Sequence, residues 1–143
     1  MLIRSARADE AEKCADIHVA ARRRMTYLRN LHTSDETRSW MMDVFASENV
    51  IVAELDGEIV GYASFSGASL SNMYVMPAYQ RRGVGTALLE AVFRQVPLGV
   101  ELWVFEDNVD AIRFYERSGF KTVSRSSGEN VEGLSDRLMR RPS

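Results

Sequence analysis

The chain has 143 residues, of which 45% are hydrophobic and 27% are charged, a balance that excludes an intrinsically disordered or membrane-embedded protein. Its formal net charge of −2 argues against bulk electrostatic attraction to nucleic acid or anionic lipid. The length predicts a single domain, residues 1–143, with a core large enough to fold without disulfides.

Cysteine, histidine and hydropathy narrow the class of protein further. Cys14 is the only cysteine and lies in a helical pattern, so we expect a reduced thiol with a structural role. His18 and His32 have no spacing with cysteine or carboxylates that indicates a zinc site, so no metal is expected. Residues 1–5 lack the apolar centre of a signal peptide, and no run approaches the roughly 18 apolar residues of a membrane span. These features predict a soluble, cytoplasmic protein.

The first third of the chain predicts a short strand, residues 2–4, followed by two helices. Asp9 and Glu12 have the spacing of a capping box, and apolar residues follow at three- and four-residue steps. These apolar residues are Cys14, Ile17, Ala21, Met25 and Leu28. After a loop through residues 30–32, Ser34 is expected to cap the second helix. Its predicted inner face consists of Trp40, Met41, Val44 and Phe45.

Three strands and a helix are predicted in the middle of the chain. Residues 50–55 and 58–65 are β-rich runs joined by Asp56-Gly57, a pair favoured in type I′ turns, which predicts a β-hairpin. A further strand covers residues 70–75. After a glycine-rich turn, residues 84–94 have a helical pattern. Its predicted buried face consists of Val84, Ala87, Leu88, Ala91 and Val92.

The last third predicts a strand, a helix and two more strands. A helix separates the strand at 100–105 from the strand at 70–75, so we expect these two to be parallel neighbours. Asn108 is expected to cap a helix that runs through Ser118 and ends at Gly119. Two strands, 121–125 and an edge-like 134–141, complete the chain. The order predicts an α/β (mixed α+β) fold, with a mostly antiparallel sheet of six to seven strands and helices on both faces.

The turn at residues 80–85, Gln-Arg-Arg-Gly-Val-Gly, joins a strand to a helix N-terminus. The first turn of a helix leaves backbone N–H groups unpaired, and together with the helix dipole these favour a bound anion. Gly83 and Gly85 carry no side chain to block a phosphate, while Arg81 and Arg82 add positive charge. The turn therefore predicts a local anion site, and an ordinary glycine-capped turn is the alternative interpretation.

Two common phosphate motifs do not fit this turn. Leu88 stands where a dinucleotide fingerprint needs a small residue, and the Gly-Lys-Ser/Thr of a P-loop is absent. The pattern Gln/Arg-x-x-Gly-x-Gly after Val-x-Pro instead resembles the coenzyme A pyrophosphate loop of the GNAT superfamily of acyl-CoA-dependent N-acyltransferases. A second segment, Asn108-x-x-Ala111-x-x-Phe114-Tyr115-x-x-x-Gly119-Phe120, resembles the other signature segment of that superfamily. Together the two motifs cover residues 72–120, and by them the chain is identified as a GNAT member.

The resemblance implies direct transfer of an acetyl group from acetyl-CoA to a primary amine of a small molecule, peptide or protein, without a metal. It also implies that the strands at 70–75 and 100–105 splay apart and that the pantetheine arm enters the gap, pairing with the backbone of residues 73–75. The pyrophosphate would lie on the N–H groups of residues 81–86, with Gln80 closing the turn. The implied coenzyme-binding residues are Met73, Tyr74, Val75, Gln80, Arg81, Arg82, Gly83, Val84, Gly85, Thr86, Asn108 and Tyr115.

The resemblance also implies catalytic roles. Tyr115 matches the family's general acid, which would protonate the departing CoA thiolate, and packing on the sheet is its alternative role. Seven helical residues advance about 700°, so Asn108 and Tyr115 share a face, and Asn108 can bind the arm, cap its helix or do both. Residues 70–73 lack the carboxylate that many relatives carry, so the base is Glu101 or a water chain. A thioester route through Cys14 is disfavoured by its expected place in the core.

Acceptor selection is expected to depend on residues 27–33 and 126–133. These segments contain Tyr27, His32, Glu129 and Glu132, with Trp40 and Trp103 expected near them, and the acidic side chains would suit a cationic amine. The missing strand carboxylate leaves a non-catalytic acyl-CoA sensor as the alternative to an enzyme. Nucleic-acid binding through residues 22–24 and 140–141 is disfavoured by the net charge. Residues 22–24 are consecutive on the predicted helix and do not form one stripe, so we expect them to belong to a solvated face. The resemblance is compatible with a homodimer.

Overall fold

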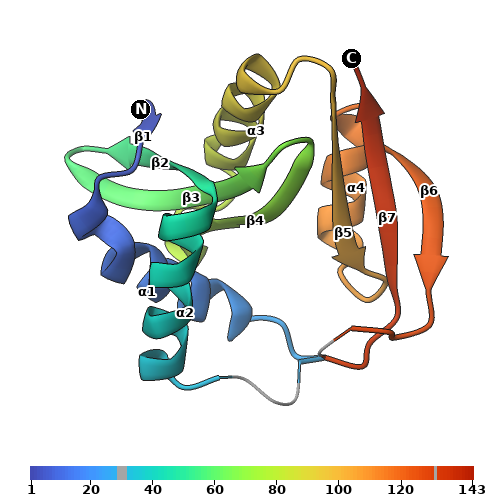
Figure 1. Cartoon of the computed structure of the whole chain (residues 1–143), viewed down its shortest axis with the longest axis horizontal. Helices are drawn as coiled ribbons and strands as arrows, with labels where there is room; N and C mark the ends of the chain where they lie inside the picture. The colour runs from blue at the N-terminus through green and yellow to red at the C-terminus, as the bar shows by residue number, and fades with distance from the viewer. Residues whose placement is uncertain (29–31, 131) are drawn as a thin grey trace.

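The computed structural model describes residues 1–28, 32–130 and 132–143. A seven-stranded sheet runs through the molecule in the order β1-β2-β3-β4-β5-β7-β6, with helices on both faces (Figure 1). The strands are β1 (Leu2–Ser5), β2 (Asn49–Leu55), β3 (Glu58–Ser66), β4 (Ser69–Val75), β5 (Gly99–Phe105), β6 (Lys121–Ser126) and β7 (Asp136–Pro142). The helices are α1 (Ala11–Arg22), α2 (Ser34–Ser47), α3 (Val84–Gln95) and α4 (Val109–Arg117), with the 3-10 turns η1 (Ala8–Glu10) and η2 (Pro77–Tyr79). The predicted fold class and order of elements are confirmed.

The hairpin between β2 and β3 is built as its turn residues predict. Asp56 and Gly57 have φ angles of 52° and 80°, the pair of left-handed conformations that a type I′ turn requires. The two strands then pair along their whole length, from Leu55 opposite Glu58 to Asn49 opposite Phe65. This hairpin forms the central part of the sheet half that carries α1, α2 and α3.

The alternation of residues along these strands explains why both faces of the sheet are covered. Val52 packs with Tyr62 and the buried residues of α1 and α2, whereas Ile51 and Ala53 pack in the cluster that includes α3 and α4. Successive strand residues point to opposite faces, so one strand contributes to both layers. The predicted core residues Cys14, Ile17, Ala21, Met41, Val44, Val84, Leu88, Ala91 and Val92 are all buried.

Several predicted details of the helices were wrong. The predicted capping box of Asp9 and Glu12 does not form, because Glu10 accepts the backbone N–H of Arg7 instead. The cap of α2 is Thr33, not Ser34, since Thr33 and Glu36 exchange hydrogen bonds between side chain and backbone at 2.8 and 3.1 Å. The Thr-x-x-Glu spacing of a capping box was present in the sequence and favours this start.

Three further predictions differ from the structure: the end of α1, the inner face of α2 and the edge position of the last strand. Helix α1 ends at Arg22, so Met25 and Leu28 lie beyond it, although Leu28 is still buried. Trp40, predicted on the inner face of α2, is 38% exposed. Strand β7 is not an edge strand, because it lies between β5 and β6 and leaves β6 at the edge. The connection between β6 and β7 allows the last strand to enter the sheet beside β5.

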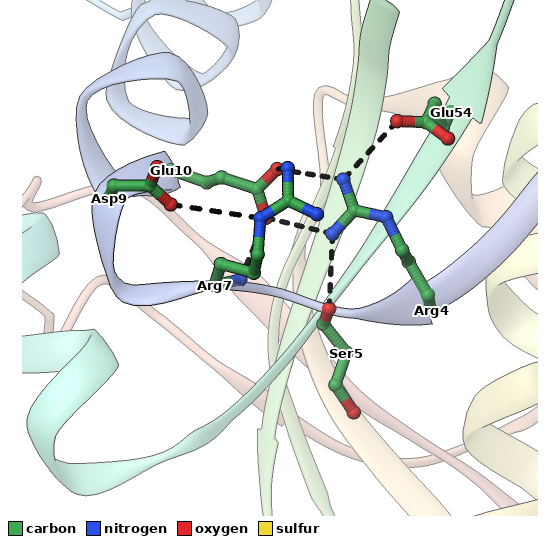
Figure 2. A network of polar contacts seen from close by, with 6 residues as sticks. All are labelled: Arg4, Ser5, Arg7, Asp9, Glu10 and Glu54. Carbon is green, nitrogen blue, oxygen red and sulfur yellow. Dashed lines mark hydrogen bonds and ion pairs between the residues drawn. The ribbon is translucent and has the colours of Figure 1, made fainter. Parts of the chain in front are cut away.

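An ion-pair network fixes the first strand to the turn before α1 (Figure 2). The Arg4 guanidinium donates to both carboxylate oxygens of Glu10 at 2.8 and 2.7 Å and reaches Glu54 on β2 at 3.3 Å. Glu10 is buried, and it also accepts the backbone N–H of Arg7 at 2.7 Å. The Arg4 hydrogen bonds lower the pKa of the Glu10 carboxyl to about 2. The charged form of Glu10 is therefore the one that holds β1 and α1 together.

Replacing Gly61 by alanine is expected to destabilise the fold by about 1–3 kcal/mol. A Cβ there would lie 3.0 Å from Val84 Cγ1 and 3.2 Å from both Leu88 Cδ1 and the Tyr74 carbonyl oxygen, so these neighbours on α3 and β4 would have to shift by a few tenths of an ångström. Urea unfolding measures the change. The control is Gly85→Ala, where the new Cβ would make an ordinary 3.5 Å contact with Phe114 and the change is expected to be neutral or stabilising. Equal stability of Gly61→Ala and the unmodified protein would contradict the close packing.

Substituting Glu10 by glutamine is expected to lower the unfolding free energy at neutral pH by about 1–3 kcal/mol, because a charge-assisted hydrogen-bond network is lost. Since the pKa of Glu10 is lowered on folding, its contribution is present above the usual glutamate pKa of about 4.3 and is lost as pH falls toward about 2. Denaturant unfolding between pH 7 and pH 2 tests both statements. Asp9→Asn is the matched control, because Asp9 is exposed and has one ion pair at 3.8 Å, so a change within about 0.5 kcal/mol is expected. A stability gap between Glu10→Gln and the unmodified protein that stays constant with pH would contradict the linkage.

Candidate functional site

The sheet opens between β4 and β5, the parallel pair that the sequence predicts. These strands pair at Ser69 and Glu101, next to a hydrogen bond from the Glu101 N–H to the Ala68 carbonyl at 2.8 Å. Beyond that point β4 stays paired with β3 as far as Val75, and β5 stays paired with β7 as far as Phe105. The facing edges of the two strands separate toward their C-terminal ends. A cavity of about 1940 Å³ is lined by residues of both strands and of the helices around them.

The glycine-rich turn lies at the open end of this gap. Arg81 and Gly83 have φ angles of 65° and 81°, and Gly83 is the N-cap of α3 without a side-chain hydrogen bond. A non-glycine residue in the left-handed region is uncommon and is held there by its surroundings. The Gln80 side-chain amide donates to the Val75 carbonyl at 3.3 Å and links the turn back to β4. Because no side chain caps α3, the N–H groups of its first turn are available to an anion.

Helix α4 begins at the facing side of the cavity. The Asn108 side-chain oxygen accepts the Ala111 N–H at 3.2 Å, so Asn108 caps the helix as predicted. Its amide nitrogen is not used in that cap, and Asn108 lines the cavity. Gly85 of α3 and Phe114 of α4 are close enough that a Cβ on the glycine would touch the phenyl ring. The starts of α3 and α4 therefore flank one end of the same cavity.

Tyr115 lies on α4, lines the cavity and is 9% exposed. Its ring packs against Phe114 and Phe120, with centroids 5.3 and 5.4 Å away. Burial raises the pKa of the Tyr115 phenol above its usual value, and Tyr74 adds to the rise. The phenol is therefore protonated at neutral pH.

All of the predicted coenzyme-binding residues line the cavity except Arg82 and Val84. Val84 is 1% exposed and belongs to the core, and the Arg82 guanidinium lies 5.4 Å from the centroid of the Tyr79 ring. Glu101 is also absent from the lining, because it lies where β4 and β5 still pair. Its carboxylate accepts a hydrogen bond from Arg140 at 2.7 Å. The geometry gives Glu101 no place beside the cavity, and we do not retain it as the base.

The wall formed by α1 and α2 contains residues that the sequence did not indicate. His18 is buried, and its Nδ1 lies 2.7 Å from the Tyr62 hydroxyl oxygen. Its ring centroid is 4.8 Å from that of Trp40 and 4.7 Å from that of Tyr74, the latter edge-on. His18 follows Cys14 by one helical turn, so the sequence pattern marks it as part of the core face, and nothing in the pattern shows that this face reaches a cavity.

Arg22 connects the two halves of the molecule across the mouth of the cavity. Its guanidinium donates to the Tyr74 hydroxyl and to the Glu132 carboxylate, both at 3.2 Å. Figure 1 shows the chain after α1 approaching the connection between β6 and β7, where Glu132 lies. The side chain of Arg22 is 18% exposed, so the prediction of a solvated face was wrong for this arginine. The run of three arginines in the sequence did not indicate that one of them would face inward.

The segments predicted to select the acceptor do border the cavity. Its lining includes the predicted residues Tyr27, His32, Trp40, Trp103, Glu129 and Glu132. The parts of these segments at residues 29–31 and 131 lie outside the described residues. Asp136, which the sequence did not indicate, also lines the cavity: its Oδ2 accepts from Asn130 at 3.1 Å, and its buried Oδ1 has no hydrogen-bond partner among the described residues.

No group of three or more His, Cys, Asp or Glu side chains in the described part of the chain is arranged to hold a metal ion. None of the helices in residues 1–28, 32–130 and 132–143 has the length and apolar character needed to cross a membrane.

Solved structures share this fold over nearly the whole chain. The solution structure of apo-form YjaB from Escherichia coli superposes with a TM-score of 0.80, covering 97% of this chain and 95% of that one at 22% identity. The structure of yncA from Salmonella typhimurium with its cofactor acetyl-CoA superposes with a TM-score of 0.77, covering 99% and 93% at 21% identity. At these identities the likeness concerns the fold.

Comparison of sequences identifies the family. The chain is 40% identical over 73 residues to the peptidyl-lysine N-acetyltransferase YiaC of Escherichia coli, an alignment that covers 50% of this chain and 49% of YiaC. It is 28% identical over 135 residues to the peptidyl-lysine N-acetyltransferase YjaB of Salmonella typhimurium, covering 90% and 89%. The chain thus spans about half or less of the length of the first relatives that it matches. It spans most of the length of YjaB. The profile of the acetyltransferase (GNAT) family matches residues 14–120, and the chain belongs to that family.

Proposed function

We propose that this protein is an acetyl-CoA-dependent N-acetyltransferase that moves an acetyl group by direct transfer to a primary amine. The observation that carries this proposal is the gap between β4 and β5, which opens at the uncapped N-terminus of α3 and is flanked by Tyr115. An uncapped helix N-terminus and a protonated phenol in the lining of one cavity support the proposal.

The coenzyme would bind along the edge of β4. Its pyrophosphate would rest on the N–H groups of residues 81–86, where the helix dipole and the charge of Arg81 favour an anion. The pantetheine amides would pair with the backbone of residues 73–75, as an added strand does. These residues lie on the edge of β4 that is not paired with β5. The Asn108 amide nitrogen would donate to the arm, since the cap of α4 uses only the side-chain oxygen.

The reaction forms a C–N bond and breaks a C–S bond. A neutral amine attacks the thioester carbonyl carbon, and the CoA thiolate leaves from the tetrahedral intermediate. Tyr115 would donate the proton that converts the thiolate to the thiol, and burial keeps its phenol protonated for that role. The protonated amine must lose one proton before it attacks, since a lysine amine titrates near ~10.4 and an α-amino group near ~8. The attacking nitrogen loses a second proton as the amide forms, and that proton would restore the Tyr115 phenol. With Glu101 outside the cavity, water in the cavity is the route that we propose for both protons.

A non-catalytic acyl-CoA sensor is the second candidate function. The specific observation in its favour is that β4 carries no carboxylate at residues 70–73, where many members of the family have a base. A sensor has no need of a proton donor beside the thioester, whereas Tyr115 lines the cavity and is protonated. The enzyme is therefore the better-supported proposal, and release of CoA in the presence of amines separates the two.

Acetyl-CoA is expected to raise the melting temperature of the protein, since a ligand at 100 times its dissociation constant stabilises the native state by ~2.7 kcal/mol. Gly83→Ala should reduce that rise, because alanine is strained at a φ of 81° and would shift the N–H groups at the start of α3. The matched control is Gly57→Ala, which places the same strain at a φ of 80° in the β2–β3 turn, with open space around the new Cβ in both cases.

The two variants should lose similar stability without ligand, and the control should keep the full acetyl-CoA shift. Differential scanning fluorimetry with acetyl-CoA and CoA gives both numbers. No shift in the unmodified protein with either compound would refute the coenzyme site.

Tyr115→Phe is expected to lower turnover by about 10²- to 10⁴-fold, the range for loss of a general acid, with the acetyl-CoA dissociation constant changed by less than about twofold. Turnover is measured as CoA thiol release with an amine panel, and affinity by calorimetry. Tyr79→Phe is the control, since Tyr79 also lines the cavity and the phenyl ring keeps its contact with Arg82. If Tyr115→Phe turned over as fast as the control, the ring of Tyr115 would have only a packing role.

A further inference from the structure

His18 is a buried imidazole in the wall of the cavity, on α1 and in contact with residues of α2, β3 and β4. It is 8% exposed, lines the cavity, and lies between the rings of Trp40 and Tyr74. One ring nitrogen, Nδ1, is 2.7 Å from the hydroxyl oxygen of Tyr62. The proposed reaction does not use His18, so its arrangement needs a separate explanation.

The hydrogen bond to Tyr62 fixes where the imidazole carries its proton. Tyr62 is fully buried, and His18 is the only partner of its hydroxyl among the described residues. If Nδ1–H donated to the Tyr62 oxygen, the phenolic hydrogen would point into the core without an acceptor, which costs the desolvation of a buried donor. The Tyr62 hydroxyl therefore donates to Nδ1, and the proton of the neutral ring is on Nε2.

The ring also stays uncharged. Burial lowers the pKa of His18 to about 3, and the charges of Arg22 and His32 act in the same direction. At neutral pH the imidazole thus presents an uncharged N–H at Nε2. A neutral imidazole of this kind polarises a carbonyl in known active sites through its N–H.

Nε2 is the ring nitrogen of His18 that is left for a ligand. Nδ1 is engaged by Tyr62, and the side chain lines the cavity. Among the described residues Nε2 has no hydrogen-bond partner, and it is not one of their three buried side-chain atoms without a partner. Arg22, one helical turn further along α1, lines the cavity as well, and its guanidinium has donors only.

We propose that His18 is a positioning residue for the acceptor, whose carbonyl or carboxylate oxygen accepts a hydrogen bond from the Nε2–H. The inference rests on the proposed function and deepens it, since it selects amines that belong to a peptide or an amino acid over plain alkylamines. His18 lies on the α1 side of the sheet and Tyr115 on the α4 side, so the acceptor approaches the thioester from the face opposite the general acid.

The tautomer is tested first, by the ¹⁵N NMR shifts of the His18 ring in the purified protein with CoA. We expect a protonated Nε2 and an unprotonated Nδ1 from pH 5 to 8, and a shift of the Nε2–H signal on adding Nα-acetyl-lysine amide or alaninamide. The matched probes without a carbonyl are n-pentylamine and isopropylamine, which should leave the signal in place. A proton on Nδ1, or equal responses to both kinds of probe, would overturn the proposal.

Kinetics with the same amine pairs and acetyl-CoA test the role in selection. An asparagine side chain at position 18 can replace Nδ1 as the acceptor for the Tyr62 hydroxyl, but it does not reach the position of Nε2. A glutamine side chain can supply an N–H donor in the place of Nε2. His18→Asn is therefore expected to raise the KM of the carbonyl-bearing amine of the preferred pair by about 5- to 20-fold and to change the KM of the matched alkylamine by less than about twofold. His18→Gln is expected to keep the preference for the carbonyl-bearing amine. A preference that is the same in His18→Asn and the unmodified protein would overturn the proposal.

The two sets of measurements separate this inference from the function on which it rests. If CoA is released equally well with carbonyl-bearing amines and with alkylamines, the protein is a transferase and the proposed role of His18 is refuted. A carbonyl-specific shift of the Nε2–H signal without any CoA release means that His18 binds the oxygen and that the proposed transferase function is refuted.

Discussion

The constraint on which the rest of the structure depends is that β4 and β5 pair at one end only. Each strand keeps a partner on its other side, β3 for β4 and β7 for β5, so both open edges stay extended although they lack hydrogen bonds to one another. Backbone N–H and C=O groups on the two open edges are left without a ladder partner, and an extended ligand can supply one. The same opening gives α3 and α4 a common cavity at their first turns.

An opening in the middle of a sheet requires contacts that hold its two sides in place. Tyr27 packs edge-on against Phe105 of β5 with ring centroids 5.8 Å apart, and Arg22 pairs with Glu132 beyond it. The first contact comes from the chain that follows α1 and the second from the last residue of α1. Both reach the half of the sheet that contains β5, β7 and β6, or its connecting loop (Figure 1).

Two walls of the cavity each contribute a buried, neutral hydrogen-bonding group. Tyr115 lies on α4 and His18 on α1, and burial shifts the pKa of each side chain in the direction that favours its uncharged form. Charged side chains line the cavity as well, among them Arg81, Arg22, Glu132 and the buried Asp136. In the proposed reaction Arg81 would attract the coenzyme phosphates, while the neutral groups would face the thioester and the neutral amine.

The sequence by itself determined the order of the elements, the Asp56-Gly57 hairpin, the anion turn before α3 and the cap of α4, because each depends on local backbone chemistry over a few residues. It also placed most of the expected coenzyme-binding residues, since they follow from two contiguous motifs. Tertiary structure alone decided that β7 enters the sheet beside β5, that Glu101 lies at the closed end, and that His18, Arg22 and Asp136 border the cavity. Helical periodicity shows which residues face inward, but only the separation of two strands decides whether the inside is core or cavity.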